Sequence, residues 1–434
     1  MSGSRTVRPM PWWFSPRVLT WCVLLPTYVG LWVASELLGL KLSTAKGFSF
    51  FHGEAFLHGL AGLLALGYGT LLPVHLLAIR DPRRLGLRPP VGYIYFVGLL
   101  AVFGYVWWFR DLATNPSILL DALRSPTFSY QMRASIERSA GLGSLATLGL
   151  AFFVLVAHRA WTLREPLPGP LRALAVLLLL MTVFRAFAWA ERLALFEVAV
   201  VLALFGFGHS ERAGRGTLGA LRPLVPAVAI AAGVLFFGIG EYFRSWASHY
   251  SQHETSFWTF IGQRLVNYYF QALNTGAGMI TVLEWPSLQF GNTLDWLHRF
   301  PILLGPIFRY IVELQPTFYL ERFGDPEFNN PSGLFGVLYD MGLAPAILLL
   351  AVTGLLAQSA FRAFREPDNV LGIFFPILYL TVIEFFRYWY LGNSRAFLFI
   401  LALVGAAMLA RAPAGAAARA VLPGAAPAMS GGLR

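Results

Sequence analysis

Apolar runs of about 15 to 22 residues, separated by short polar breaks, recur along most of this chain. A run of this length matches one helical crossing of a bilayer, in which the backbone hydrogen bonds are all made within the segment. The composition agrees, since 57% of the residues are hydrophobic and 13% are charged, against about a quarter charged in soluble domains. The sequence therefore predicts an all-α, polytopic integral membrane protein. It excludes a soluble globular domain, a transmembrane barrel and a disordered chain.

Ten membrane-spanning helices are predicted when these runs are read against the breaks between them. The expected spans are residues 18–38, 56–79, 91–109, 142–157, 173–187, 193–208, 224–240, 344–360, 370–386 and 396–410. With their connections they form a single transmembrane domain over residues 1–410. The first run is interrupted by Pro26 and has no small-residue cleavage site, so we expect a retained helix and no signal peptide. The lone cysteine, Cys22, rules out an intramolecular disulfide and a cysteine-based metal site.

The charges are distributed unequally between the two sides of this predicted topology. If the N-terminus is cytoplasmic, the inner segments carry 18 of the 33 basic residues and five of the 22 acidic ones. This asymmetry satisfies the positive-inside rule and places both termini in the cytoplasm. The net charge of +11 is then a record of topology, and nucleic acid is not an expected partner.

Most of the chain between spans is expected on the outer face. Residues 241–343 form the longest interval between spans, and an interval of that length is usually functional. Within it, residues 300–312 are apolar but too short and proline-broken to span, which favours a re-entrant or interfacial segment. Residues 110–141 are expected to form a small helical cap, and residues 411–434 a disordered cytoplasmic tail.

Two hairpins place arginines at the outer membrane surface, Arg185 and Arg192 in the first and Arg387 and Arg395 in the second. One interpretation is that they reach lipid headgroups or pair with nearby glutamates, which are Glu191, Glu197 and Glu384. The other is an anion site, because guanidinium binds phosphate oxygens in a bidentate way at any pH. On this second interpretation, five outer arginines converge on one pyrophosphate or sugar phosphate: Arg192, Arg244, Arg264, Arg387 and Arg395.

Three carboxylates, Glu241, Asp340 and Glu384, are expected at the same surface. Partial desolvation there suits a carboxylate to general-base work, although ion pairing explains it equally. His249 and His253 have helical i, i+4 spacing, but no acidic third ligand accompanies them, so solvated loop histidines are favoured and no metal is expected. The sequence Asp325-Pro-Glu327 is typical of an exposed turn.

The stretch from Asn330 to Gly342 reads Asn-Pro-Ser-Gly-Leu-Phe-Gly-Val-Leu-Tyr-Asp-Met-Gly. It resembles the P-S-x-x-G-x-x-Y-x-x-x-G stretch that follows the large outer loop of the Wzy-type O-antigen polymerases, which are bacterial oligosaccharide repeat-unit polymerases. The matching residues, with the first glycine about one place away, are Pro331, Ser332, Phe335, Gly336, Tyr339 and Gly342. Arg192, Arg395 and the large late periplasmic loop are also similar to that family, for which a GT-C-like fold is expected. The likeness covers most of the chain as architecture but only a short part of it as a motif.

This resemblance implies a metal-independent glycosyltransferase without a cofactor, on the periplasmic face of a bacterial inner membrane. The donor and the acceptor would each be a polyprenyl-pyrophosphate-linked glycan, and a chain-length regulator is a further expected partner. The arginines would stabilise the pyrophosphate leaving group, and Glu241 or Asp340 would take the proton from the attacking hydroxyl. Tyr268, Tyr269 and Tyr339 would bind sugar, although anchoring at the membrane interface explains aromatic residues equally.

Two other functions compete with polymerisation. The related O-antigen ligases usually have His-Asn where this chain has Asn329-Asn330, which argues against a ligase. A lipid-linked glycan flippase or another transporter commonly has internal repeats and charges near the bilayer midplane. In this sequence the charges gather at one surface, which favours an enzyme.

Overall fold

The computed structural model describes residues 10–40, 49–72, 88–123, 132, 141–189, 191–209, 224–250, 256–299, 307, 316–325, 327–328, 330–364, 366 and 369–410. Every element in these ranges is a helix, which confirms the all-α prediction for the described part of the chain. The predicted re-entrant segment, apart from Ile307, and the predicted tail at 411–434 fall in the remaining ranges.

In the described ranges, seven helices are long and apolar enough to cross a membrane, and each lies at a predicted span. They are Pro16–Leu37 (α1, Pro16–Val18; η2, Leu19–Leu24; α2, Leu25–Trp32; η3, Val33–Leu37), α4 (Val91–Trp108), Leu142–Thr162 (η5, Leu142–Thr147; α8, Leu148–Ala157; η6, His158–Thr162), α9 (Gly169–Ala188), α10 (Arg192–His209), Val225–Ala247 (α12, Val225–Glu241, and the start of η9, Tyr242–Tyr250) and α18 (Leu343–Ala363).

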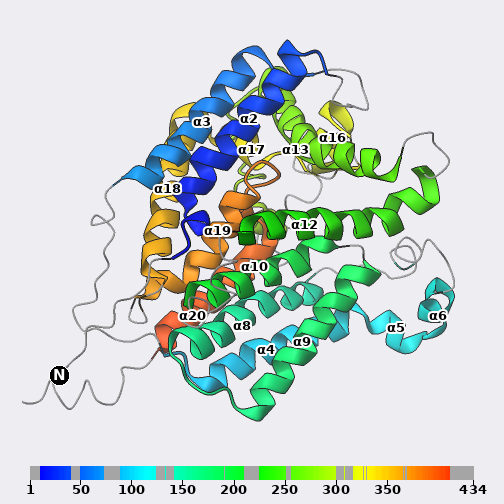
Figure 1. Ribbon diagram of the computed structural model, residues 1–434, viewed down its shortest axis with the longest axis vertical. Coiled ribbons are helices and arrows are strands. Elements are labelled where there is room, and N and C mark those ends of the chain that lie inside the picture. Colours follow the sequence, from blue (N-terminus) through cyan, green and yellow to red (C-terminus); the bar gives the residue numbers. More distant parts are fainter. Residues whose placement is uncertain are drawn as a thin grey trace, which may run out of the picture.

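The other three predicted spans also contain helices in their described parts. They are α3 (Gly53–Leu71), Val370–Ile383 (η11, Val370–Phe374; α19, Phe375–Ile383) and α20 (Ser394–Leu409). The last two are shorter apolar helices. In Figure 1, α5 (Arg110–Thr114) and α6 (Ser117–Leu123) lie on the same side of the molecule as the end of α12, whereas the end of α20 (red) lies on the opposite side. The spans α4 and α12 therefore end on one side of the molecule and α20 ends on the other. This is expected if consecutive spans run in alternating directions.

The predicted large outer segment, residues 241–343, is mainly helical in its described part. It contains α13 (Phe257–Val282), α14 (Asp295–Arg299), α16 (Pro316–Phe323) and α17 (Gly333–Met341). Ser256 caps α13 by accepting a hydrogen bond from the Thr259 N–H at 3.3 Å. The second half of α13 is buried continuously from Phe270 to Ile280, because it packs against α3, α16 and α17. The prediction of an outer loop therefore missed a 26-residue helix.

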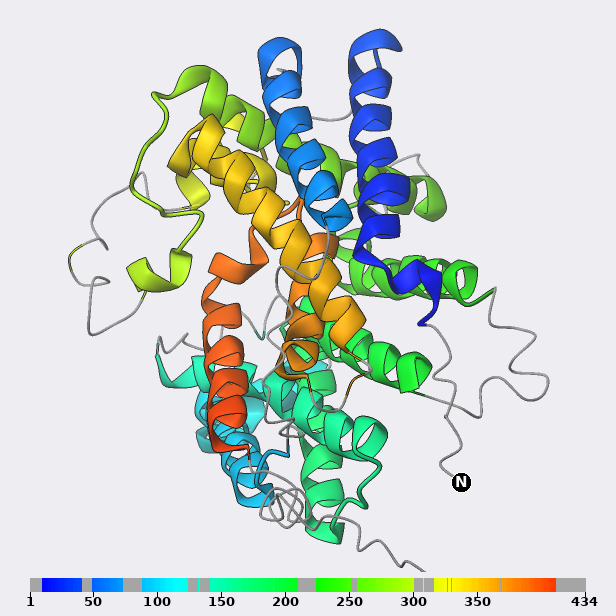
Figure 2. The same ribbon diagram turned by 90° about the vertical axis from the view of Figure 1, so that its left-hand side faces the viewer.

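Glycines allow the close helix contacts of this part. A Cβ atom at Gly276 would lie 2.5 Å from the Phe335 Cβ, and one at Gly278 would lie 2.7 Å from the Phe323 Cβ. Helices α3 and α18 cross obliquely (Figure 2), and a Cβ at Gly354 would lie 2.1 Å from the Leu66 carbonyl oxygen. Small residues thus bring these backbones together, as is common in membrane helix pairs.

The motif from Asn330 to Gly342 contains α17 and contacts the segment that follows α19. The Ser332 side chain caps α17 by accepting from the Phe335 N–H, and Gly342, with φ +81°, separates α17 from α18. Two backbone N–H groups at the start of α17 donate to the segment after α19, Ser332 to the Arg387 carbonyl at 3.1 Å and Leu334 to the Phe385 carbonyl at 3.2 Å. The motif therefore fixes the position of the segment that carries Arg387.

Candidate functional site

Charged side chains from four parts of the chain meet near the ends of the spans that the sequence predicts to face outward. Arg192 begins α10, Glu241 ends α12, Arg264 lies in α13, and Arg387 follows α19. They are grouped around the buried Tyr268 of α13. We call the following set the Tyr268 site: Arg192, Glu241, Arg264, Tyr268, Glu384 and Arg387.

Arg192 joins α10 to α12 and α13. Its Nη1 donates to the Phe237 carbonyl at 3.0 Å, and its Nη2 donates to Glu241 at 2.5 Å and to the Tyr268 hydroxyl at 3.3 Å. The guanidinium also lies 4.3 Å from the Phe237 ring centroid. A Cβ at Gly240 would lie 2.4 Å from the Arg192 Cδ, so glycine at that position leaves room for the arginine stem.

Glu241 is fully buried and is shared by two arginines. Its Oε1 accepts from Arg192, and its Oε2 accepts from the Arg264 Nε at 3.3 Å and the Ser245 hydroxyl at 3.1 Å. Burying a carboxylate without partners would be costly. The two guanidinium groups therefore explain how Glu241 can lie inside the protein.

Arg264 is held on its other side by Glu327, which its Nη2 contacts at 2.6 Å. Burial alone would lower the pKa of Arg264, but the hydrogen bond with Glu327 and the charge of Glu241 raise it above its ordinary value. Tyr250 donates to the second Glu327 oxygen at 3.2 Å, and burial together with the Glu327 charge raises the Tyr250 pKa. Glu327 lies in a turn and its side chain is 35% exposed, but it also pairs with Arg264, a contact that the predicted turn did not include.

Arg387 completes the Tyr268 site. It donates to Glu384 at 2.8 Å, and its guanidinium lies 5.4 Å from the centre of the Tyr268 ring. Burial alone would lower the pKa of Arg387, and the Glu384 charge is the main factor that raises it. The neighbouring Tyr269 has a raised pKa, because it is buried and because Glu384 is nearby. The guanidinium groups of Arg192 and Arg387 therefore both lie close to Tyr268.

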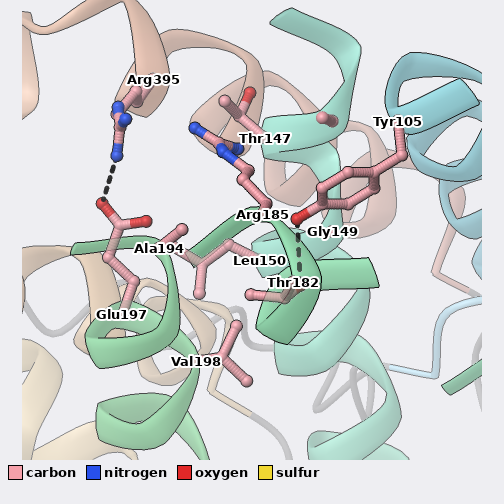
Figure 3. Close-up of a pocket in the computed structure, with 11 residues that line it drawn as sticks. Tyr105, Thr147, Gly149, Leu150, Thr182, Arg185, Ala194, Glu197, Val198 and Arg395 are labelled. Carbon is pink, nitrogen blue, oxygen red and sulfur yellow. Dashed lines mark hydrogen bonds and ion pairs between the residues drawn. The ribbon is translucent and has the colours of Figure 1, made fainter. Parts of the chain in front are cut away.

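Arg395 belongs to a second group, at the turn between α9 and α10. It pairs with Glu191, which also accepts from the Arg185 Nε and Nη2 at 2.8 and 2.7 Å. Arg395 lies 3.6 Å from Glu197, and the Tyr390 hydroxyl donates to Glu197 at 2.8 Å. A small cavity adjoins this group (Figure 3), between α4, η5, α8, α9, α10 and α20. The prediction that Arg395 converges with the other four arginines on one anion is not supported by these contacts.

The Asp340 carboxylate accepts hydrogen bonds from the loop that follows α13. Its Oδ2 accepts from the backbone N–H groups of Asn292 and Thr293 at 2.8 and 2.6 Å, and its Oδ1 accepts from the Asn292 side chain at 3.1 Å and the Ser287 hydroxyl at 3.4 Å. Burial raises the pKa of Asp340, and these hydrogen bonds oppose that rise. Tyr339 is buried and packs against Tyr319. The geometry gives Asp340 a structural role.

This assignment predicts different outcomes for two Asp340 variants. Asp340→Asn places one oxygen where both backbone N–H groups donate. The protein level in the membrane and the glycosyl-transfer activity expected from the sequence should therefore stay within about threefold of wild type. Asp340→Ala leaves two buried donors unpaired, at about 1 to 3 kcal/mol each, and should lower the melting temperature and the protein level together. A general base would behave differently, because Asp340→Asn would then abolish activity in a protein of normal stability.

Two predicted residues are only partly described. The backbones of Arg244 and His249 lie in η9, but their side chains are outside the described set. A third residue, His253, lies outside the described ranges altogether. Among the described residues, no group of three His, Cys, Asp or Glu side chains lies close enough to hold a metal ion.

The structure shows the described arginines paired with glutamates, which is one of the two interpretations given by the sequence. The pairs are Arg185–Glu191, Arg192–Glu241, Arg264–Glu241, Arg264–Glu327, Arg387–Glu384, Arg395–Glu191 and Arg395–Glu197. Anion binding remains a prediction, and it requires the guanidinium groups to change partner. Sequence reasoning did not select Ser245, Tyr250 or Glu327, because none stands in a recognisable motif.

Comparison with known proteins adds no identification: no family model, no curated protein and no solved structure matches this chain.

Proposed function

We propose that this protein is a membrane polymerase that joins polyprenyl-diphosphate-linked oligosaccharide repeat units at the outer face of a bacterial inner membrane. The proposal rests on three arginines from separate segments: Arg192 contacts both the buried Tyr268 and the buried Glu241, Arg264 pairs with the same carboxylate, and Arg387 lies near the same tyrosine. Neighbouring guanidinium groups suit a ligand with several phosphate oxygens. The motif that resembles the repeat-unit polymerases supports the same function, since it holds the Arg387 segment in place.

In the proposed reaction, the bond between the donor sugar C1 and the phosphate oxygen breaks, and a bond forms between C1 and an acceptor hydroxyl oxygen. The electron pair leaves with the polyprenyl diphosphate, whose growing charge Arg192, Arg264 and Arg387 stabilise. Both Glu241 oxygens accept hydrogen bonds from arginines. A diphosphate that takes over these guanidinium groups releases Glu241, which then accepts the proton of the acceptor hydroxyl.

The test is the surface glycan of a deletion strain. Loss of a polymerase leaves single repeat units on the surface lipid or on polyprenyl diphosphate, and wild-type protein restores long chains. Lipid-linked repeats trapped on the cytoplasmic leaflet would instead identify a flippase, and long chains that stay on polyprenyl diphosphate would identify a ligase. Either result would overturn the proposal.

A further inference from the structure

Two glutamates of this part of the protein are each held by an arginine and by a tyrosine. The arginine supplies a positive charge, and the tyrosine hydroxyl donates a further hydrogen bond to the same carboxylate. The two sets are Glu327 with Arg264 and Tyr250, and Glu197 with Arg395 and Tyr390. A carboxylate with two such partners keeps one donor when the other moves away.

A third set of the same composition lacks the hydrogen bond from the tyrosine. Glu384 is 5% exposed and accepts from Arg387 at 2.8 Å. Tyr388 is the next residue, and its backbone N–H donates to the Glu384 carbonyl at 3.0 Å, which closes one helical turn. Side chains four positions apart in such a turn lie on the same face. The Tyr388 hydroxyl is nevertheless buried without a hydrogen-bond partner among the described residues.

The charges around Tyr388 favour a hydroxyl that can donate to a carboxylate. Burial raises the pKa of Tyr388 well above its ordinary value, and the charge of Glu384 raises it more than the charge of Arg387 lowers it. The hydroxyl therefore keeps its proton at physiological pH. Buried donors without a partner are uncommon and destabilising. Arg387 has one too, because its Nη1 donates to Glu384 but its buried Nε has no partner among the described residues.

These spare donors match a change of partner at Glu384. A diphosphate that binds Arg387 takes away the charge that compensates Glu384, and a buried carboxylate without a partner is costly. We infer that the Tyr388 hydroxyl then donates to Glu384, so that Glu384 exchanges Arg387 for Tyr388 when a diphosphate binds. Tyr388 is thus a positioning residue, since it acts on the diphosphate only through Glu384 and Arg387. The inference rests on the proposed binding of a diphosphate at the Tyr268 site.

Tyr388→Phe removes only the hydroxyl and tests this exchange in the purified full-length protein. Its melting temperature without ligand should equal that of wild type, because no bond is lost. In titration calorimetry, inorganic diphosphate should bind about tenfold more weakly, because the bound state lacks a hydrogen bond to a charged group. Tyr390→Phe is the matched control. It loses an existing bond to Glu197, so it should lower the melting temperature and keep the diphosphate affinity within about twofold of wild type.

A double variant checks that Tyr388 acts through Glu384. Glu384→Gln removes the charge that needs a second donor, so in that background Tyr388→Phe should change the diphosphate affinity by less than about twofold. An equally large loss of affinity in both backgrounds would overturn the inference. A melting temperature of Tyr388→Phe that falls as far as that of Tyr390→Phe would also overturn it, because the hydroxyl would then be bonded before the diphosphate binds.

The outcomes separate this inference from the proposed function. If Tyr388→Phe binds diphosphate as tightly as wild type and the wild-type protein polymerises lipid-linked repeats, the polymerase proposal stands and the exchange is wrong. If the tenfold loss of affinity is found in a protein without transfer activity, the exchange stands and the polymerase proposal fails. A wild-type protein that binds no diphosphate would overturn the exchange together with the assignment of the Tyr268 site to the leaving group.

Discussion

Replacing Arg192 with lysine should lower the rate of polymerisation by about 30- to 1000-fold, the equivalent of about 2 to 4 kcal/mol in the transition state. The guanidinium of Arg192 reaches Phe237, Glu241 and Tyr268 at once. A lysine ammonium can still neutralise Glu241, so the amount of protein in the membrane should stay near normal. It cannot present a planar fork to two phosphate oxygens. The measurement is the rate of chain growth on purified lipid-linked repeats, normalised to protein level.

Arg299→Lys is the control for this experiment. Arg299 is an exposed arginine of α14 that pairs with Asp295 one helical turn away, and its replacement should leave the rate within about twofold of wild type, as is usual for surface ion pairs. Full activity of Arg192→Lys would return Arg192 to a purely structural ion pair. A collapse of the protein level in Arg192→Lys would show that lysine cannot hold α12 against α10.

Replacing Glu241 with glutamine should reduce transfer about 100- to 10,000-fold, because the acceptor hydroxyl loses its base. The same change should strengthen the binding of inorganic diphosphate, since a neutral amide no longer competes for Arg192 and Arg264. Without ligand, the two arginines are left short of one negative charge, so the melting temperature should fall and diphosphate should restore it. Calorimetry and a rate assay on the same preparation check both effects.

Glu327→Gln is the matched control for Glu241→Gln, since Glu327 also pairs with Arg264 but its side chain is 35% exposed. It should strengthen diphosphate binding slightly and keep transfer within about tenfold of wild type. A wild-type rate in Glu241→Gln would mean that another group takes the proton. Weaker diphosphate binding in Glu241→Gln would contradict the displacement of Glu241 by substrate.

The positions of the membrane helices follow from the sequence because the signal is local. A run of apolar residues is enough to predict α4, α9 or α18, since bilayer crossing depends on each segment alone. α13 was missed for the opposite reason. Its buried half carries Gln271, Asn274 and Thr275, and the partners of a polar residue there come from distant parts of the chain, as when Asn274 accepts from the Phe50 and Phe51 N–H groups.

The site was predicted less well than the helices, because it is made by contacts between distant segments. Arg192, Arg264, Arg387 and Glu241 were selected by position, and the structure brings them together around Tyr268. Position alone could not separate Arg395 from Arg387, only eight residues earlier, since which glutamate each meets depends on packing. Asp340 was expected at the same surface as Glu241, and only the hydrogen bonds from Asn292 and Thr293 reveal its structural role.

The division of the Tyr268 site between chain segments has a consequence for recombination. Glu241, Arg264 and Tyr268 belong to the large outer segment, whereas Arg192 and Arg387 come from the flanking hairpins. A chimera that exchanges residues 241–343 between two such proteins therefore inherits the two partners of the Arg192–Glu241 ion pair, and of the Arg387–Tyr268 contact, from different parents. Exchange of substrate specificity should therefore succeed only where the hairpins that carry Arg192 and Arg387 are exchanged together with residues 241–343. The hairpins and the outer segment must then evolve as one unit.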